Sequence, residues 1–92
     1  MTTRPVTVAN PLGMHARAAA RFVHVATGFH AHIRVGRDGR EVDGKSIMGI
    51  LLLAAARGTE LVVSADGPDE ADAVATLVRL IETDLGEDSC SA

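Results

Sequence analysis

The sequence is poor in aromatic residues: it has no tryptophan, no tyrosine and only two phenylalanines, Phe22 and Phe29. Proteins that bind single-stranded nucleic acid usually stack its bases on aromatic side chains, so we expect no nucleic-acid partner. Cysteine is also scarce. Cys90 is the only one, so the chain cannot form an internal disulfide. Since no Cys/His cluster has the spacing of a zinc site, we expect neither a metal nor a cofactor.

Long hydrophobic runs are missing too. The longest, residues 50–56, is much shorter than the roughly 20 residues that a helix needs to cross a bilayer. Residues 1–5 lack the apolar core of a signal peptide. We therefore expect a single domain over residues 1–92 that is cytoplasmic, monomeric and not inserted in a membrane. The polar residues 87–92 are expected to form a flexible tail.

Each half of the chain has few charges of one sign. Residues 1–59 carry eight Arg and Lys side chains and three acids, whereas residues 60–92 carry nine acids and one cation, Arg79. Such a division can steer an acidic partner towards the N-terminal half. It is equally compatible with ordinary solvated faces, so charge alone does not identify a binding surface.

Hydrophobic periodicity predicts seven elements in the order β-α-β-β-α-β-α. The expected strands cover residues 4–9, 32–35, 41–43 and 60–65, and the expected helices cover residues 16–27, 47 to 53 or 54, and 69–85, with Gly86 as the last helix stop. The loops are too short to place helices on both faces of a parallel sheet. We therefore expect an α+β fold with a four-stranded antiparallel sheet and three helices on one face.

Two of the expected helices have an apolar stripe that recurs every three or four residues and should pack on the sheet. In the first helix the stripe consists of Ala19, Phe22, Val23 and Ala26; in the last it consists of Val74, Leu77, Val78, Ile81 and Leu85. With so few aromatic residues, the core is predicted to be aliphatic.

The stretch NPLGMHARAAARF, residues 10–22, joins a turn to the start of the first helix. It places His15 where the backbone N–H groups of Ala16, Arg17 and Ala18 have no partner within the helix. These groups and the positive end of the helix dipole favour both a neutral, nucleophilic imidazole and a bound phosphoryl group. Arg17 adds a guanidinium suited to phosphate oxygens, and Arg21 extends the positive surface. The alternative is that His15 is an ordinary cap or surface residue.

Three segments resemble the HPr family, the histidine-containing phosphocarriers of the bacterial phosphoenolpyruvate-dependent phosphotransferase system. NPLGMHARAAARFV resembles the family's active-site segment, GKSIMGILLLAAARGTEL its serine-phosphorylation segment, and ADGPDEADAVATLVRLIE its closing strand, turn and helix. The similarity covers residues 5–86 in the family's order. It implies an open-faced β-sandwich that acts as a phosphocarrier and is not itself an enzyme.

The resemblance also implies roles for individual residues. His15 is expected to accept a phosphoryl group on Nδ1 from Enzyme I, ultimately from phosphoenolpyruvate, and to donate it to an Enzyme IIA. Arg17 matches the arginine that stabilises the phosphate. Ser46 matches the regulatory serine that is phosphorylated by HPr kinase/phosphorylase, which is then a third partner.

Ala18 departs from the pattern, because the family commonly has proline there. Alanine keeps an N–H that proline lacks, which predicts an additional donor near the phosphate. Alanine also occurs at this place in nitrogen-type branches of the family. The alternative function is therefore a nitrogen-branch or regulatory protein that acts mainly through phosphorylation-dependent partner binding rather than sugar uptake.

Ser46 precedes the middle helix, where serine commonly caps a helix. This helix is apolar on nearly every side, and a small domain cannot bury it all round. We expect Ile50, Leu53 and Ala54 to face inward; the residues left for partner docking are Ile47, Met48, Leu51 and Leu52. Arg21 and His24 of the first helix are expected to join this surface. The alternatives are a fully buried middle helix and, for His24, an ordinary exposed histidine.

Overall fold

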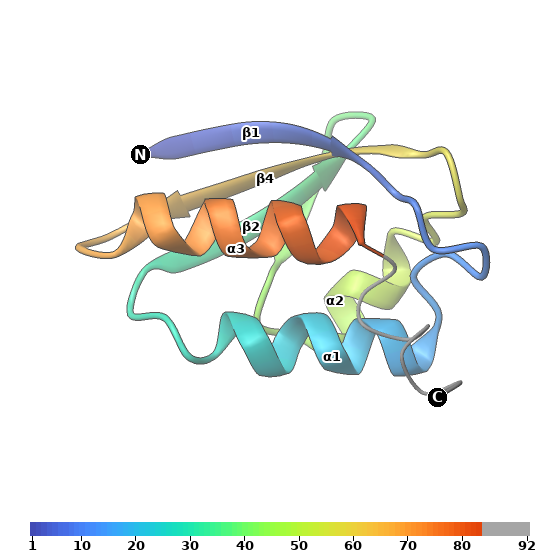
Figure 1. Cartoon of the computed structure of the whole chain (residues 1–92), viewed down its shortest axis with the longest axis horizontal. Coiled ribbons are helices and arrows are strands. Elements are labelled where there is room, and N and C mark those ends of the chain that lie inside the picture. The colour runs from blue at the N-terminus through green and yellow to red at the C-terminus, as the bar shows by residue number, and fades with distance from the viewer. Residues whose placement is uncertain (84–92) are drawn as a thin grey trace.

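The computed structural model describes residues 1–83. Within them the elements are β1 (Thr2–Thr7), α1 (Ala16–Ala26), β2 (His32–Arg37), β3 (Arg40–Asp43), α2 (Ile47–Leu52), β4 (Glu60–Asp66) and α3 (Glu70–Glu82). This order confirms the predicted β-α-β-β-α-β-α arrangement. Figure 1 shows the helices on one side of the sheet, with α2 near the end of the molecule at which α1 begins.

The four strands form one antiparallel sheet in the order β1-β4-β2-β3. β4 is the last strand in the sequence and lies between β1 and β2, so it pairs with both of them. The β2–β3 hairpin turns at Asp38 and Gly39, whose φ angles of 52° and 82° are typical of a tight two-residue hairpin turn. The predicted antiparallel α+β fold is thus confirmed.

The core lies between the sheet and the helices. Along β4, Leu61 and Val63 are completely buried, whereas Val62 between them is 39% exposed on the opposite face. This alternation is expected of a strand with one solvated face. Each layer contributes to the set of largest fully buried side chains, which includes Phe22, Ile33, Ile50, Leu61, Leu77 and Ile81. Apart from Phe22, these side chains are aliphatic, so the core is mostly aliphatic, as predicted, and lies beneath an open sheet face.

The predictions were least accurate at the ends of elements. β1 begins at Thr2 rather than at residue 4, and β2 continues to Arg37 instead of ending at residue 35. The length of a strand depends on how far it pairs with its neighbours, and the hydrophobic pattern of the strand itself does not show where that pairing ends. Val23, expected in the core stripe of α1, is only half-buried. The positions of Leu85, Gly86 and the predicted tail at 87–92 lie outside the described residues.

Ala54 was expected to face inward, and this was wrong: it is exposed. The helix ends earlier than predicted, at Leu52, with Leu53 as its C-cap. Ala54 then has a φ of 49° and leaves the helical path, so its side chain no longer follows the stripe formed by Ile50 and Leu53. Those two residues do face inward.

Candidate functional site

The turn before His15 is organised by Asn10, which is 2% exposed. Its Oδ1 accepts a hydrogen bond from the N–H of Leu12 at 3.1 Å, and its Nδ2 donates to the carbonyl of Gly13 at 3.2 Å. The N–H of Gly13 donates back to the Asn10 carbonyl at 2.9 Å. Asparagine commonly bonds the backbone two residues ahead in this way, so the Asn-Pro-Leu-Gly pattern contains the signal for this role.

Gly13 allows the turn to approach the segment that follows α2. Its φ is 69°, and a Cβ at this position would lie 2.6 Å from the carbonyl oxygen of Ala55. That same oxygen accepts a hydrogen bond from the N–H of Met14 at 2.8 Å, and Met14 is buried. The backbone entering His15 is therefore fixed against residues that are distant in the sequence.

His15 is the N-cap residue of α1 and has an extended backbone, with φ −75° and ψ 179°. The backbone N–H of Arg17 donates to the His15 Nδ1 at 3.2 Å, which is at the long end of the range for such bonds. Nδ1 is thus the acceptor nitrogen and carries a lone pair, while Nε2 carries the proton in the neutral ring. The half-buried imidazole presents Nδ1 to the first turn of α1.

The three residues of the first turn of α1 differ in exposure. Ala16 and Arg17 are exposed, but Ala18 has no exposed surface. The N–H of Ala18 is therefore covered by the rest of the protein in this conformation. No carboxylate among residues 1–83 forms an ion pair with the guanidinium of Arg17.

Ser46 is the N-cap residue of α2, as predicted. Its Oγ accepts a hydrogen bond from the N–H of Gly49 at 3.1 Å, and its carbonyl accepts from the N–H of Ile50 at 3.0 Å. The residue is half-buried. Both sequence-predicted phosphorylation sites are therefore helix N-caps whose side chains already accept a backbone N–H.

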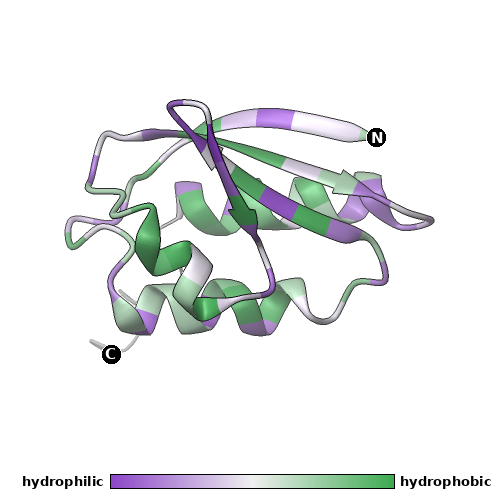
Figure 2. Ribbon diagram, turned by 180° about the vertical axis from the view of Figure 1, so that it is seen from behind, coloured by the Kyte–Doolittle hydropathy of each residue, from purple (hydrophilic) through white to green (hydrophobic). Residues whose placement is uncertain are grey.

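The outer face of α2 is apolar and exposed, so full burial of this helix is excluded. Ile47 is 42% exposed, Met48 68% and Leu52 62%. Leu51 is half-buried and packs against the core, and it contributes less to this surface than expected. Figure 2 shows α2 as mostly hydrophobic along its length. Leu12, in the turn before His15, is 73% exposed and is a further large apolar residue that the sequence patterns did not single out.

The neighbouring helix α1 carries exposed basic residues. Arg21 and His24 are exposed on α1, and α1 packs against α2. We use the term docking surface for the exposed side chains of Arg17, Arg21, His24, Ile47, Met48 and Leu52. It combines positive charge with apolar area on two adjoining helices.

Two carboxylates near the start of α3 have a structural role. The carboxylate of Asp69 accepts hydrogen bonds from the N–H groups of His30 and Ala31, both at 2.8 Å, and the bond from His30 is the main reason why the pKa of Asp69 is lowered. Glu70 accepts from the hydroxyl of Thr2 at 2.7 Å and from the N–H of Gly67 at 3.1 Å, and these bonds, with the N-terminal amino group, lower the pKa of Glu70 to about 2. The start of α3 lies at the end of the molecule opposite to the start of α1 (Figure 1).

Other kinds of site are not found within the part of the chain that the structure describes. Among residues 1–83, no group of three or more His, Cys, Asp or Glu side chains is placed to hold a metal ion. None of the helices in this range is long and apolar enough to cross a membrane.

The sequence matches a known family over nearly its whole length. A family model described as "PTS HPr component phosphorylation site" matches residues 2–83. The phosphocarrier protein HPr of Cupriavidus necator is 44% identical over 87 residues, covering 95% of this chain and 98% of that protein. The phosphocarrier protein HPr of Pseudomonas aeruginosa is 46% identical over 88 residues, with 95% and 98% covered.

Solved structures agree with this assignment. HPr-C-His from Thermoanaerobacter tengcongensis matches with a TM-score of 0.90 at 42% identity, covering 95% of this chain and 98% of that one. An HPr dimer from the same organism matches with a TM-score of 0.74, covering 95% and 100%, so the monomeric state stays a prediction. This chain belongs to the HPr family, the phosphocarrier proteins of the phosphotransferase system, which carry a phosphoryl group and are not themselves enzymes.

Proposed function

We propose that His15 accepts a phosphoryl group on Nδ1 from Enzyme I, which takes it from phosphoenolpyruvate, and passes it to an Enzyme IIA. The observation that carries this proposal is the hydrogen bond of 3.2 Å from the backbone N–H of Arg17 to Nδ1. It places the Nδ1 lone pair at the positive end of α1. A phosphoryl group bound there is stabilised by the same N–H groups and by the helix dipole.

Phosphoryl transfer changes the covalent bonds at phosphorus and the acceptor of one hydrogen bond. The Nδ1 lone pair forms a bond to phosphorus while the bond from phosphorus to its donor on Enzyme I breaks, and the electron pair leaves with that donor. The proton stays on Nε2. The N–H of Arg17 moves from Nδ1 to a phosphoryl oxygen, so the first turn of α1 needs little rearrangement. Transfer to Enzyme IIA is the reverse process with a different acceptor.

The two exposed residues of the first turn, Ala16 and Arg17, provide the remaining stabilisation. Their backbone N–H groups are donors for the phosphoryl oxygens, and the Arg17 guanidinium matches phosphate geometry. Ala18 is left out of this set because it is completely buried. For the same reason, we expect Ala18→Pro to leave the lifetime of the phosphohistidine unchanged.

The docking surface is the proposed contact site for Enzyme I and Enzyme IIA. Its apolar residues on α2 provide area that becomes buried on binding, and the arginines on α1 favour an acidic partner. Because His15 lies at the N-terminus of α1, a partner that covers this surface also covers the imidazole. The partners then supply the catalysis, and this chain supplies the carrier group.

Ser46 is proposed as the regulatory phosphorylation site, with HPr kinase/phosphorylase as the third partner. A phosphoserine adds a charge of about −1.5 to −2. It would lie next to Ile47 and Met48, within the docking surface, and would repel an acidic partner. Inhibition of Enzyme I binding follows without any large change of fold.

The test of the carrier function is labelling by Enzyme I with phosphoenolpyruvate. We expect an acid-labile, base-stable label on the wild-type protein and on His32→Ala, which removes an exposed histidine of β2, but not on His15→Ala. Label that survives in His15→Ala would contradict the assignment. Chasing the labelled protein with sugar-type and nitrogen-type Enzyme IIA domains separately then decides between the sugar branch and the nitrogen branch.

The test of Ser46 uses two variants. Ser46→Asp adds charge and keeps a side chain that can cap α2, whereas Ser46→Ala removes the cap without adding charge. We expect Ser46→Asp to raise the KM of Enzyme I for this protein and Ser46→Ala to leave it unchanged. An unchanged KM in Ser46→Asp would show that charge at this position does not control docking.

A further inference from the structure

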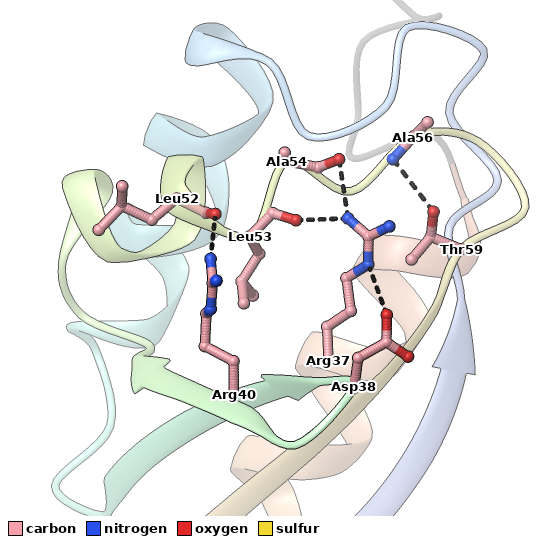
Figure 3. A network of polar contacts seen from close by, with 8 residues as sticks. All are labelled: Arg37, Asp38, Arg40, Leu52, Leu53, Ala54, Ala56 and Thr59. Carbon is pink, nitrogen blue, oxygen red and sulfur yellow. Dashed lines mark hydrogen bonds and ion pairs between the residues drawn. The ribbon is translucent and has the colours of Figure 1, made fainter.

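Two arginines of the β2–β3 hairpin donate hydrogen bonds to backbone carbonyls at the C-terminal end of α2. A guanidinium nitrogen of Arg37 donates to the carbonyl oxygens of Leu53 at 2.6 Å and Ala54 at 3.0 Å. Arg40 donates to the carbonyl of Leu52 at 3.4 Å. Figure 3 shows both side chains reaching from the hairpin to the end of the helix. The last carbonyls of a helix lack partners within it, and a cation there also complements the helix dipole.

One of the bonded residues is in an unfavourable conformation. Ala54 has a φ of 49°, which glycine adopts freely and alanine does not. Such a residue persists only where its surroundings hold it. Arg37 holds it on one side. On the other side, the N–H of Ala56 donates to the Oγ1 of Thr59 at 3.2 Å (Figure 3).

The residue between these two anchors contacts the turn that leads to His15. The carbonyl oxygen of Ala55 accepts the hydrogen bond from the N–H of Met14, at 2.8 Å. Gly13 packs against the same oxygen so closely that a Cβ would not fit. A change in the backbone at Ala54 therefore moves the Ala55 carbonyl and, with it, the backbone that enters His15.

We propose that Arg37 is a positioning residue for phosphoryl transfer. By bonding the carbonyls of Leu53 and Ala54, it fixes the Ala55 carbonyl against which the His15 turn is seated. This role depends on the proposed function of His15. Arg37 is on β2 and outside the docking surface, so its loss should affect the geometry of the imidazole more than partner binding.

The first test measures structure and needs no partner protein. It compares Arg37→Ala with Arg34→Ala, which removes an exposed arginine of the same strand that pairs with Glu41 at 3.7 Å. In Arg37→Ala we expect hydrogen exchange of the Met14 N–H to accelerate roughly tenfold, as the loss of stabilising hydrogen bonds would allow. The ¹⁵N shifts of the His15 ring and the Arg17 amide should change as well. Arg34→Ala should behave as the wild type.

The second test measures phosphorylation by Enzyme I. We expect kcat to fall roughly tenfold in Arg37→Ala with little change in KM, because small errors in the position of a reacting group are costly. Ala54→Gly in the same background should restore part of kcat, since glycine keeps the left-handed conformation unaided. Arg37→Lys should keep part of the wild-type kcat, because a single nitrogen of Arg37 makes the bonds to both the Leu53 and the Ala54 carbonyl and a lysine ammonium can replace it.

The outcome that would overturn the role of Arg37 is agreement between Arg37→Ala and Arg34→Ala in exchange, ¹⁵N shifts and kcat. If Enzyme I fails to phosphorylate even the wild-type protein, the proposed function of His15 fails. The exchange and shift measurements still decide in that case whether Arg37 positions the His15 turn.

Discussion

Gly13→Ala tests how closely the His15 turn depends on its contact with the segment after α2. Gly13 has a φ of 69°, and an added Cβ would lie 2.6 Å from the Ala55 carbonyl oxygen and 3.0 Å from the Cα of Ala56. Both contacts are with backbone atoms, which cannot rotate away as a flexible side chain would. The turn and the segment after α2 must therefore separate, and the hydrogen bond from Met14 to Ala55 is weakened.

The size of the effect has two parts. Alanine in the left-handed conformation costs about 1–2 kcal/mol, and forcing extra volume into a packed contact costs about 1–3 kcal/mol. The free energy of unfolding should therefore fall by about 2–5 kcal/mol, a large share of the roughly 5–15 kcal/mol typical of a domain. The sequence also provides a control. Gly39 has a φ of 82°, but a Cβ there meets nothing within 4 Å, so Gly39→Ala carries only the conformational cost.

Urea unfolding of both variants, with the rate of phosphorylation by Enzyme I, separates the two parts. We expect Gly13→Ala to lose about 1–3 kcal/mol more than Gly39→Ala. Its kcat should also be lower, whereas Gly39→Ala should keep the wild-type rate, because its turn lies at the tip of the hairpin. Equal losses of stability in the two variants, or a wild-type kcat in Gly13→Ala, would refute the reasoning.

Three further predictions concern capping, docking and pH. Ser46→Ala should lower the free energy of unfolding by about 1 kcal/mol through loss of the cap of α2, as measured by urea unfolding. Met48→Ser should raise the KM of Enzyme I for this protein several-fold, while the free energy of unfolding changes by no more than about 0.5 kcal/mol. Val62→Ser, on the open face of the sheet, should leave this KM unchanged. Because the pKa of Glu70 is lowered from 4.5 to about 2, its charge favours folding above a pH of about 4.5, and this contribution is lost as the pH falls towards 2. Glu70→Gln should therefore be less stable at neutral pH and show a flatter loss of stability in that acidic range, as followed by thermal unfolding at a series of pH values.

The order of elements was predictable because it depends on local patterns. Period-two alternation in β4 and the apolar stripe of α1 are each present in a short segment of the sequence. The position of His15 at the start of α1 and the capping by Ser46 follow from the same local information. The resemblance then indicated which chemistry this arrangement serves.

Contacts between distant segments were not predictable in this way. Asp69 was expected only as the first residue of the last helix, yet its carboxylate accepts hydrogen bonds from the N–H groups of His30 and Ala31. Nothing near Arg37 in the sequence indicates that it bonds Leu53 and Ala54. The burial of Ala18 likewise depends on how the helices pack against one another and on the sheet. The roles of such residues depend on contacts between segments that are distant in the sequence, so they become visible only in the folded structure.

The central claim is that the phosphoryl group is carried on Nδ1 of His15. The most direct measurement is ¹⁵N NMR of the histidine-labelled protein after phosphorylation by Enzyme I and phosphoenolpyruvate. The account predicts phosphorus coupling and a large shift at Nδ1 of His15, with the Arg17 amide shifting at the same time and His24, His30 and His32 unchanged. Phosphorylation at Nε2 of His15, or at any other histidine, would contradict it.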